Sequence, residues 1–326
     1  MTTPATDPTD RLPLITVGIT CYRAGDTIGR AIASALAQDW PRLELVVVDD
    51  CSPDDSPQVV ERAIAGHANA RLVRRPVNGG PAAARNTILD EARGEFVAFF
   101  DDDDTSLPAR VRLQCRRLLD HEAVGGSRLT ACYTSGSRRY ANGYTLQVDA
   151  IGSRGPVLAG PAVADYLLFN GRHDGLFYGG GTPTCALMAR RSTFEAVGGF
   201  DAKLRRVEDI DFAVRLACAG GQFIGCPEPL YEQTATEGSD KTPRMNLQAE
   251  LQLVDNHADY LRQRGRHVYA RDWFKIRYYH FTGARLRFAL ALAWFLIRFP
   301  LAGTQHLLRS APGRLQHEKK MTRKYQ

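Results

Sequence analysis

The sequence has no long hydrophobic run, no paired cysteines and no internal repeat. Its longest uncharged apolar stretch is ten residues, Phe288 to Ile297, whereas a membrane-spanning helix needs roughly 20. The seven cysteines are scattered singly, none of them forms a C-x-x-C pair, and their number is odd. This excludes a disulfide framework and a zinc-site spacing, and it is typical of a reducing compartment. The first 13 residues lack an apolar core and early basic residues, so we expect a disordered lead-in (1–13) rather than a signal peptide.

Charge is unevenly distributed along the 326 residues. The whole chain carries 42 Lys and Arg against 36 Asp and Glu. Residues 261–326 contain 15 of these basic residues and only 2 of the acidic ones, which leaves 27 against 34 in the rest. The basic character therefore belongs to the C-terminal fifth. With 44% hydrophobic and 24% charged residues, the whole chain has an ordinary composition for a globular protein with a full core.

The first 120 residues alternate strand-like and helix-like segments. We expect strands at 15–20, 43–48, 71–74 and 96–100, with helices at 27–38, 58–65, 81–93 and 108–119. Repeated β-α-β units of this size imply a parallel sheet with helices on both faces, which binds ligands at the carboxyl ends of its strands. Further on we expect a hairpin at 139–148, a glycine-rich loop at 170–181, a strand at 183–188 and a helix at 207–221.

Four consecutive aspartates, Asp101 to Asp104, directly follow one of these apolar strands. Carboxylates this close repel one another, so either they face water or something compensates their charge. The run could be a solvated turn before the helix that begins at Pro108. A second predicted strand also ends in acids, Asp49 and Asp50, which favours a site for Mg²⁺ or Mn²⁺ with substrate phosphates as further ligands.

One alternative is a phosphatase of the haloacid-dehalogenase type, because Asp101, Asp103 and Thr105 also form a D-x-D-x-T pattern. In that family the motif usually closes the first strand, and a later apolar strand ends in acidic metal ligands. Here about 100 residues of β-α-β pattern precede the motif, and the later acidic pair, Glu208 and Asp209, follows a polar stretch. The phosphatase interpretation is therefore the weaker one.

Four blocks occur in order: ITVGITCYRAGDTIGRAIASALAQ, ELVVVDDCSPDDS, NGGPAAARNTILDEARGEFVAFFDDDD and GGFDAKLRRVEDIDFAVRLACAGG. Together they resemble family 2 of inverting, nucleotide-sugar-dependent glycosyltransferases, over residues 14–235. The resemblance implies an α/β fold of the GT-A type, Rossmann-like, with a mainly parallel central sheet flanked by helices. It divides the chain into a catalytic domain (14–242, with a nucleotide-binding half at 14–124 and an acceptor half at 125–242) and a basic helical C-terminal extension (243–326).

The resemblance also assigns the nucleotide site. Asp49 and Asp50 match the acidic pair from which an aspartate hydrogen-bonds the base. Thr20 and Tyr22 match positions that line the base and ribose pocket. Arg85, followed by Asn86, matches an arginine–asparagine pair beside the nucleotide, although a surface helix arginine is the alternative.

The aspartate run aligns with the family's L-D-x-D-D motif. Asp101 and Asp103 are then the DxD carboxylates: Asp103 coordinates Mn²⁺ or Mg²⁺, and Asp101 faces the ribose or the metal shell. Asp102 is the spacer within the nucleotide site, and Asp104 is a secondary ligand or an acceptor-side group.

Glu208 and Asp209 resemble the family's ED motif at the start of a helix. Transfer with inversion needs a base to take the proton of the attacking hydroxyl, and a carboxylate with a raised pKa suits that role. We expect Asp209 to be the base and Glu208 its partner, with Asp211 as the residue most easily confused with it. The alternative is that these acids only open a helix.

Two further loops concern the diphosphate and the acceptor. Many relatives close a basic or histidine-containing loop over the diphosphate, but residues 231–244 contain no histidine, so Lys241 or Arg244 is expected there. Residues 175–183 either hold the acceptor or connect two elements.

The C-terminal segment interleaves basic and aromatic residues on predicted short helices. This pattern suits an anionic membrane surface contacted through residues 261–326. Packing or homodimerisation is the alternative, and no fold that recognises nucleic acid is evident. We therefore expect a metal-dependent inverting glycosyltransferase that uses a nucleoside-diphosphate sugar, preferably UDP-based. Its expected acceptor is a saccharide or lipid-linked saccharide, used in polysaccharide or glycolipid assembly at the inner face of the cell membrane. The rival from another class is a nucleotide-binding relative without turnover.

Overall fold

The computed structural model describes residues 12–235 and 242–321. Nearly all of the predicted lead-in (1–13), and Lys241, lie outside these residues. The described chain forms two compact units. Unit 1 comprises residues 12–138, 146–164 and 173–234, and unit 2 comprises residues 139–145, 165–172, 235 and 242–321. The division of unit 1 into nucleotide-binding and acceptor halves remains a prediction.

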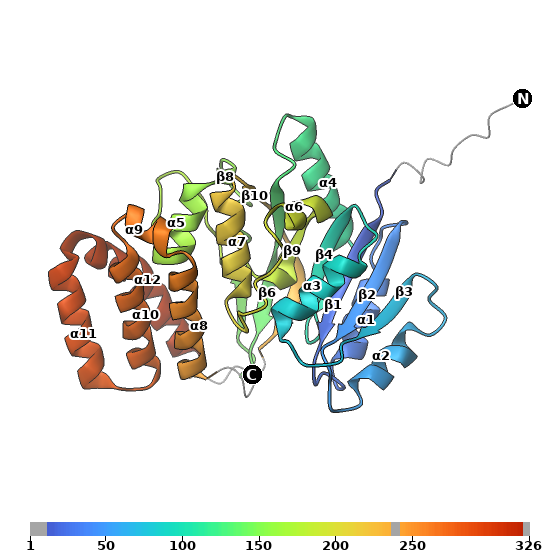
Figure 1. The fold of residues 1–326 in the computed structure, drawn as a ribbon, viewed down its shortest axis with the longest axis horizontal. Helices are drawn as coiled ribbons and strands as arrows, with labels where there is room; N and C mark the ends of the chain where they lie inside the picture. The colour runs from blue at the N-terminus through green and yellow to red at the C-terminus, as the bar shows by residue number, and fades with distance from the viewer. Residues whose placement is uncertain (1–11, 236–241, 322–326) are drawn as a thin grey trace, which may run out of the picture. The chain divides into compact units, whose positions relative to one another are not determined.

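The N-terminal half of unit 1 is a parallel sheet in the order β3-β2-β1-β4 (Figure 1). Its strands are β1 (Ile15–Cys21), β2 (Leu43–Asp49), β3 (Ala70–Arg74) and β4 (Phe96–Asp101). Strands β1, β2 and β4 are buried along almost their whole length, because helices cover both faces of a parallel sheet. All four predicted strands are confirmed.

Helices connect these strands at the expected places. They are α1 (Ile28–Leu36), α2 (Ser56–Ile64), α3 (Pro81–Glu91) and α4 (Arg110–Ala123). In α1, Ile28, Ala31, Ile32 and Ala35 are buried, as their helical spacing predicts. The last helix begins two residues after Pro108 and ends beyond the predicted residue 119.

Beyond β4 the sheet continues as β9-β6-β10-β5, with antiparallel pairing of β4 to β9, β9 to β6 and β10 to β5. The elements are β5 (Thr105–Ser106), β6 (Thr130–Arg139), β7 (Thr145–Val148), β8 (Leu158–Ala159), α5 (Pro161–Phe169), β9 (Leu187–Arg190), α6 (Arg191–Ala196), α7 (Glu208–Cys218) and β10 (Gln222–Thr234). The predicted hairpin is present, since β7 pairs with β6.

The predicted strand at 183–188 is wrong for its first half. Residues Thr184–Ala186 form a 3₁₀ turn, and β9 starts only at Leu187. Pro183 has no N–H to give to a sheet, and its carbonyl accepts the N–H of Ala186 at 3.0 Å, which closes the turn.

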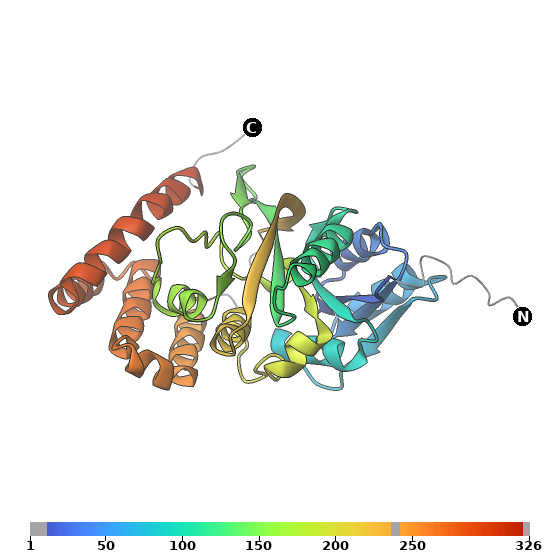
Figure 2. The ribbon, with the colours of Figure 1, turned by 90° about the horizontal axis from the view of Figure 1, so that it is seen from above.

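Unit 2 is helical, as expected for the C-terminal extension (Figure 2). It contains α8 (Pro243–Asn256), α9 (Ala258–Gln263), α10 (His267–Phe281), α11 (Arg285–Arg298) and α12 (Pro300–Met321). Helix α10 packs against α8 and α11, and α11 packs against α12. Tyr269, Ile276 and Phe295 form the small core of this unit. None of the described helices has both the length and the hydropathy to cross a membrane.

Candidate functional site

The ends of three parallel strands bring the predicted nucleotide-site residues together. Thr20 lies opposite Val48 on one side and Asp101 on the other, and Cys21 lies opposite Asp49. Asp49 is fully buried, and its carboxylate oxygens each lie 3.3 Å from the N–H of Ser52. The parallel register thus places Thr20, Asp49 and Asp101 along one edge of the sheet, where ligands bind in folds of this kind.

Asp50 anchors the loop that precedes α3. Its carboxylate accepts the N–H groups of Gly79 at 3.0 Å and Gly80 at 2.7 Å, and it lies 3.2 Å from the guanidinium of Arg75. Gly80 has a φ of +83°, which a residue with a side chain rarely adopts. The structure therefore engages both oxygens of Asp50 within the chain, while its predicted contact with the base remains a prediction.

Tyr22 and Asp102 link two loops at this edge. The N–H of Tyr22 donates to Oδ2 of Asp102 at 3.0 Å, and the tyrosine side chain is 41% exposed. Burial, together with the neighbouring Asp103 and Asp101, raises the pKa of Asp102 to about 7, against the effect of the Tyr22 hydrogen bond. The spacer aspartate thus ties the aspartate run to the loop after β1, leaving the Tyr22 ring accessible beside it.

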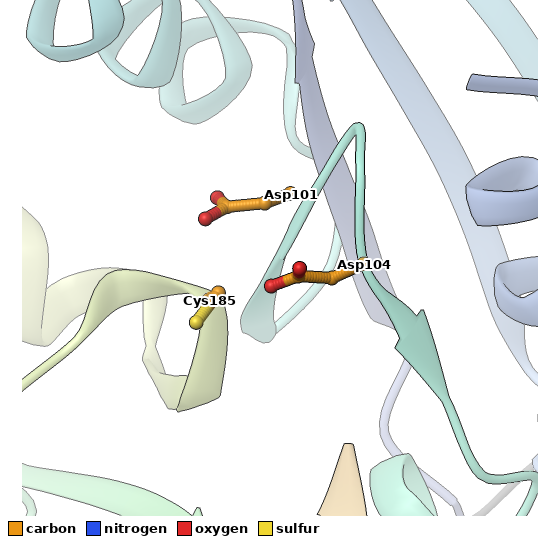
Figure 3. A group of neighbouring side chains, drawn as sticks. All are labelled: Asp101, Asp104 and Cys185. Carbon is orange, nitrogen blue, oxygen red and sulfur yellow. The ribbon is translucent and has the colours of Figure 1, made fainter. Parts of the chain in front are cut away.

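Asp101 and Asp104 form a group with Cys185, and their ligand atoms all lie within 4.8 Å of one another (Figure 3). Oδ1 of Asp104 accepts the N–H of Thr234 at 3.2 Å, but its Oδ2 is buried without a hydrogen-bond partner among the described residues. Burial and the charges of Asp101 and Asp103 raise the pKa of Asp104 to about 8. Burial also raises the pKa of Asp101, with Asp103 adding to it and Arg85 opposing it.

These observations fit a hard divalent cation. Burial raises the pKa of both neighbouring carboxyls, and Asp104 has a buried oxygen without a hydrogen-bond partner among the described residues. Mg²⁺ or Mn²⁺ binds such oxygens. Burial raises the pKa of the Cys185 thiol well above its usual value, so this sulfur stays neutral and is a poor ligand for either ion. Asp103 is not part of the group, and its ligation of the metal remains a prediction.

A buried arginine lies close to the acidic group. Arg110 is 1% exposed and donates to the carbonyl of Phe99 at 2.9 Å and to the hydroxyl of Ser106 at 2.8 Å. Its guanidinium also lies 4.2 Å from the centre of the Phe100 ring. Burial lowers the pKa of Arg110 to about 10, so it still carries a positive charge at neutral pH.

Arg85 connects the aspartate run to the ED motif. It is buried, with Nη1 2.5 Å from Oε1 of Glu208 and Nη2 3.5 Å from Oδ1 of Asp101. Burial and the charge of Glu208 raise the pKa of the adjacent Asp209 to about 7, while Arg85 opposes the shift. Val207, directly before this pair, has a φ of +58°, an unusual backbone conformation for a β-branched residue. The predicted site residues Arg85, Asp101, Glu208 and Asp209 thus form one network.

Asp211 is distinguished from Asp209 by its contacts. It is 1% exposed and lies 2.8 Å from Nε of Arg215 on the next turn of α7. The same arginine donates to the carbonyls of Val197 and Gly199. Asp211 is therefore part of the contacts that fix α7, and its ion pair with Arg215 sets it apart from Asp209.

Arg205 joins the two loops that flank this network. Its guanidinium donates to Oδ1 of Asn78 at 2.9 Å and to the carbonyl of Asn78 at 3.2 Å. Arg205 was not predicted. Of the two basic residues that were predicted to close over the diphosphate, Lys241 lies outside the described residues and Arg244 lies in the first turn of α8, in unit 2, so this role remains a prediction.

Sequence reasoning missed several members of this site. It assigned no role to Gly79 and Gly80, and it placed Cys185 in a strand. Arg75 and Arg110 were not predicted, because in the sequence a buried or partly buried arginine looks the same as a surface arginine. Only the fold reveals which carboxylates and carbonyls they contact.

Comparison with known proteins matches residues 16–193 to "Glycosyl transferase family 2". The succinoglycan biosynthesis protein ExoO of Rhizobium meliloti is 34% identical over 232 residues, which is 71% of this chain and 63% of ExoO. A second succinoglycan biosynthesis protein of that organism, ExoU, is 40% identical over 107 residues, 33% of this chain and 30% of ExoU. The chain thus spans less than two thirds of the length of these relatives.

Solved structures agree on the fold. S. aureus TarS 1–349 in complex with UDP-GlcNAc superposes with a TM-score of 0.61 at 20% identity, over 87% of this chain and 80% of that one. The complex of TarS 1–349 with UDP gives a TM-score of 0.58 at 21% identity, over 82% and 72% of the two chains. The expected GT-A fold is therefore confirmed. The family match covers more than half of the chain, which therefore belongs to glycosyl transferase family 2.

Proposed function

We propose that this protein transfers a sugar from a UDP-sugar to a hydroxyl of a saccharide or lipid-linked saccharide, with the aid of Mn²⁺ or Mg²⁺. The observation that carries the proposal is the network in which Arg85 holds Glu208 and Asp101 together beside Asp209, whose pKa is about 7. It brings a candidate base next to the candidate metal and diphosphate site. Family membership favours transfer over the phosphatase alternative.

The donor binds at the edge formed by β1, β2 and β4. Tyr22 offers an exposed ring on which a base or ribose can pack, and Thr20 lies between β2 and Asp101 in the same row. Asp49 and Asp50 supply buried carboxylates that suit the imide N–H of uracil. UDP is favoured as the nucleotide because related TarS was solved with UDP and with UDP-GlcNAc.

A divalent cation held by the aspartates would neutralise charge on the leaving diphosphate. Asp101 and Asp104 supply paired carboxylates for it, and we assign Asp103 as a further ligand on the family pattern. The charge of Arg85 opposes the rise that burial causes in the pKa of Asp101, and so favours the ionised form that binds a cation. Asp101 thus has the proposed carboxylate ligands Asp103 and Asp104 as neighbours, together with the positively charged guanidinium of Arg85.

Asp209 takes the proton from the acceptor hydroxyl. A base is most effective when its pKa lies near the working pH, and a value of about 7 meets that condition. Glu208 contributes in two ways, because its charge raises the pKa of Asp209 and its pairing with Arg85 fixes the first turn of α7. Attack from the side opposite the leaving diphosphate gives inversion at the anomeric carbon.

The cellular role follows from the relatives by analogy. ExoO and ExoU are succinoglycan biosynthesis proteins, so we assign this chain to polysaccharide assembly. We place it in the cytoplasm at the inner face of the membrane, with residues 14–124 binding the donor and residues 125–242 the acceptor.

A thermal-shift titration tests the donor part of this proposal. Purified protein is melted with UDP, GDP and dTDP, each with and without Mn²⁺. A ligand that binds only the folded state raises the melting temperature by mass action. We expect a metal-dependent rise with UDP that is absent with the other two nucleotides and lost in Asp103→Asn. No rise with any nucleotide would contradict the proposed donor site.

A further inference from the structure

Exposed apolar side chains are concentrated at the end of the described chain. Among the described residues, sixteen large hydrophobic side chains are exposed, and nine of them lie between residues 281 and 321. This segment is about an eighth of the sequence. Such a concentration differs from the single exposed apolar residues found on any protein surface, and it marks a surface that contacts something apolar.

The exposed residues of α11 form one stripe. Leu286, Leu290, Trp294 and Ile297 are spaced by four, four and three residues, and they are 74%, 64%, 61% and 73% exposed. This spacing places them on one face of the helix. Residues of the other face, including Phe288, Leu292 and Phe295, pack into the core of unit 2. Figure 1 shows α11 beside α10 with no other described helix on its far side.

Helix α12 carries a second set. Leu301, Leu308 and Leu315 recur every seven residues and are 81%, 71% and 56% exposed. Residues spaced by seven share one face of a helix. Both final helices therefore present an apolar face that no other described part of unit 2 covers.

The surrounding charge is positive. Residues 281–321 contain seven Lys and Arg but one acidic residue, Glu318. That glutamate is already paired, with Arg314 at 2.8 Å and His280 at 3.1 Å. On α11, Arg285, Arg287 and Arg298 are exposed near the ends of the apolar stripe. A tryptophan and leucines on one face with arginines beside them suit a helix that lies in the interface of an anionic bilayer.

We propose that α11 and α12 form a docking surface for the headgroup and upper acyl region of an anionic lipid bilayer, with the stripe of Leu286, Leu290, Trp294 and Ile297 inserted. Fourteen residues are too few for α11 to span a bilayer, so the helix lies along the surface. A second copy of the chain is the less favoured occupant, because it would bring an equally positive surface into contact. The inference goes beyond the transfer reaction, since lipid binding is independent of donor and acceptor.

Co-sedimentation of the full chain with vesicles tests the proposal. Vesicles of phosphatidylcholine alone are compared with vesicles that also contain phosphatidylglycerol, at low and high salt. We expect binding to the anionic vesicles that weakens with salt. The double variant Arg285→Gln with Arg287→Gln should bind about thirty-fold less tightly, at the usual contribution of a basic residue near such a surface. Leu290→Glu with Trp294→Glu should bind at least about tenfold less tightly.

Val124→Glu is the matched control, because Val124 is an 85% exposed valine in unit 1. It should bind vesicles like the wild type, and circular dichroism should show that all variants keep their helix content. Absence of vesicle binding, or unchanged binding by the Leu290→Glu/Trp294→Glu variant, would overturn the proposal. Two other results would overturn it if vesicles are not bound. One is a dimer, seen in light scattering, that the Leu290→Glu/Trp294→Glu variant dissociates, and the other is binding to duplex DNA.

Discussion

Arg85 on α3 pairs with Glu208, the first residue of α7, at 2.5 Å across 123 residues of chain. Both side chains are about nine-tenths buried. Burial by itself would lower the pKa of Arg85, but Glu208 and Asp101 outweigh it, so the arginine stays charged. The pair joins α3 to the helix that carries the candidate base.

Replacing Arg85 with alanine should destabilise the fold strongly. Glu208 would keep a buried charge without a partner, which typically costs about 3–5 kcal/mol. Arg112→Ala is the control, since Arg112 pairs with Asp39 at the surface, where such pairs contribute about 0–1 kcal/mol. Urea unfolding measures both. Equal unfolding midpoints for the two variants would show that the buried pair does not stabilise the fold more than the surface pair does.

Asp209→Asn and Asp211→Asn should have opposite effects. The asparagine at position 209 cannot accept the proton, so we expect kcat to fall about 10²–10⁴-fold with the melting temperature nearly unchanged. Asp211→Asn removes the ion pair with Arg215, so the protein should be less stable while the folded protein keeps most of its kcat. Activity and melting temperature are measured on both variants. Full activity in Asp209→Asn would remove this residue as the base.

The base should be visible in the pH dependence of transfer. Asp209 must be ionised to accept a proton, and its pKa in the free protein is about 7. We therefore expect kcat/KM to rise with pH up to about 7 and then to level off. Glu208→Gln removes the charge that raises this pKa, so it should move the rise to lower pH. A rise that stays in place in this variant would argue against the coupling of the two acids.

Much of this arrangement was predictable from the sequence, because it depends on local pattern. Buried strands of apolar residues and the acids at their ends are consecutive in the chain, and the parallel sheet then brings Thr20, Asp49 and Asp101 to one edge. The ED motif was recognised by resemblance, but its link to Arg85 is a contact between distant segments that no periodicity shows.

The positions that were not predicted depend on backbone detail. Cys185 approaches the aspartates only because Pro183 turns the chain into a 3₁₀ turn before β9. The burial of Arg110 depends on three acceptors within 11 residues of it, which lie on β4, β5 and α4 and include the carbonyl of Phe99. An apolar pattern reports which face is buried, but not which polar groups are buried with it.

The aspartate run should make stability depend on pH and on metal. The pKa values of Asp102 and Asp104 in the folded chain, about 7 and about 8, exceed the ordinary 3.8. The folded state thus binds protons more tightly than the unfolded chain, and without metal the free energy of unfolding should fall as pH rises from about 4 to 8. We expect a melting temperature lower at pH 8 than at pH 5.5 by roughly 5 °C or more.

Adding Mn²⁺ should reverse this trend. Metal binding displaces protons from the carboxylates, so it is favoured at the higher pH, and the rise in melting temperature should be larger at pH 8 than at pH 5.5. Asp104→Asn should reduce both the pH dependence and the metal effect. Asp39 is an exposed acid in the loop after α1, so Asp39→Asn should change neither the pH dependence nor the metal effect. An Mn²⁺ effect that Asp104→Asn leaves intact would place the ion elsewhere.

Val207 links backbone strain to activity. Its φ of +58° costs an L-residue about 1–2 kcal/mol, and it sets the direction in which Glu208 and Asp209 enter α7. Val207→Gly relieves the strain in the folded state. Glycine also gives the unfolded chain more conformational entropy, which lowers the free energy of unfolding by about 0.4–1 kcal/mol. We expect stability within about 1 kcal/mol of the wild type and kcat lower by about tenfold, because the base is less firmly placed. Asn170→Gly, at a φ of +56° in unit 2, is the control and should leave kcat unchanged. If Val207→Gly is as active as the wild type, the strained residue has no part in positioning the base.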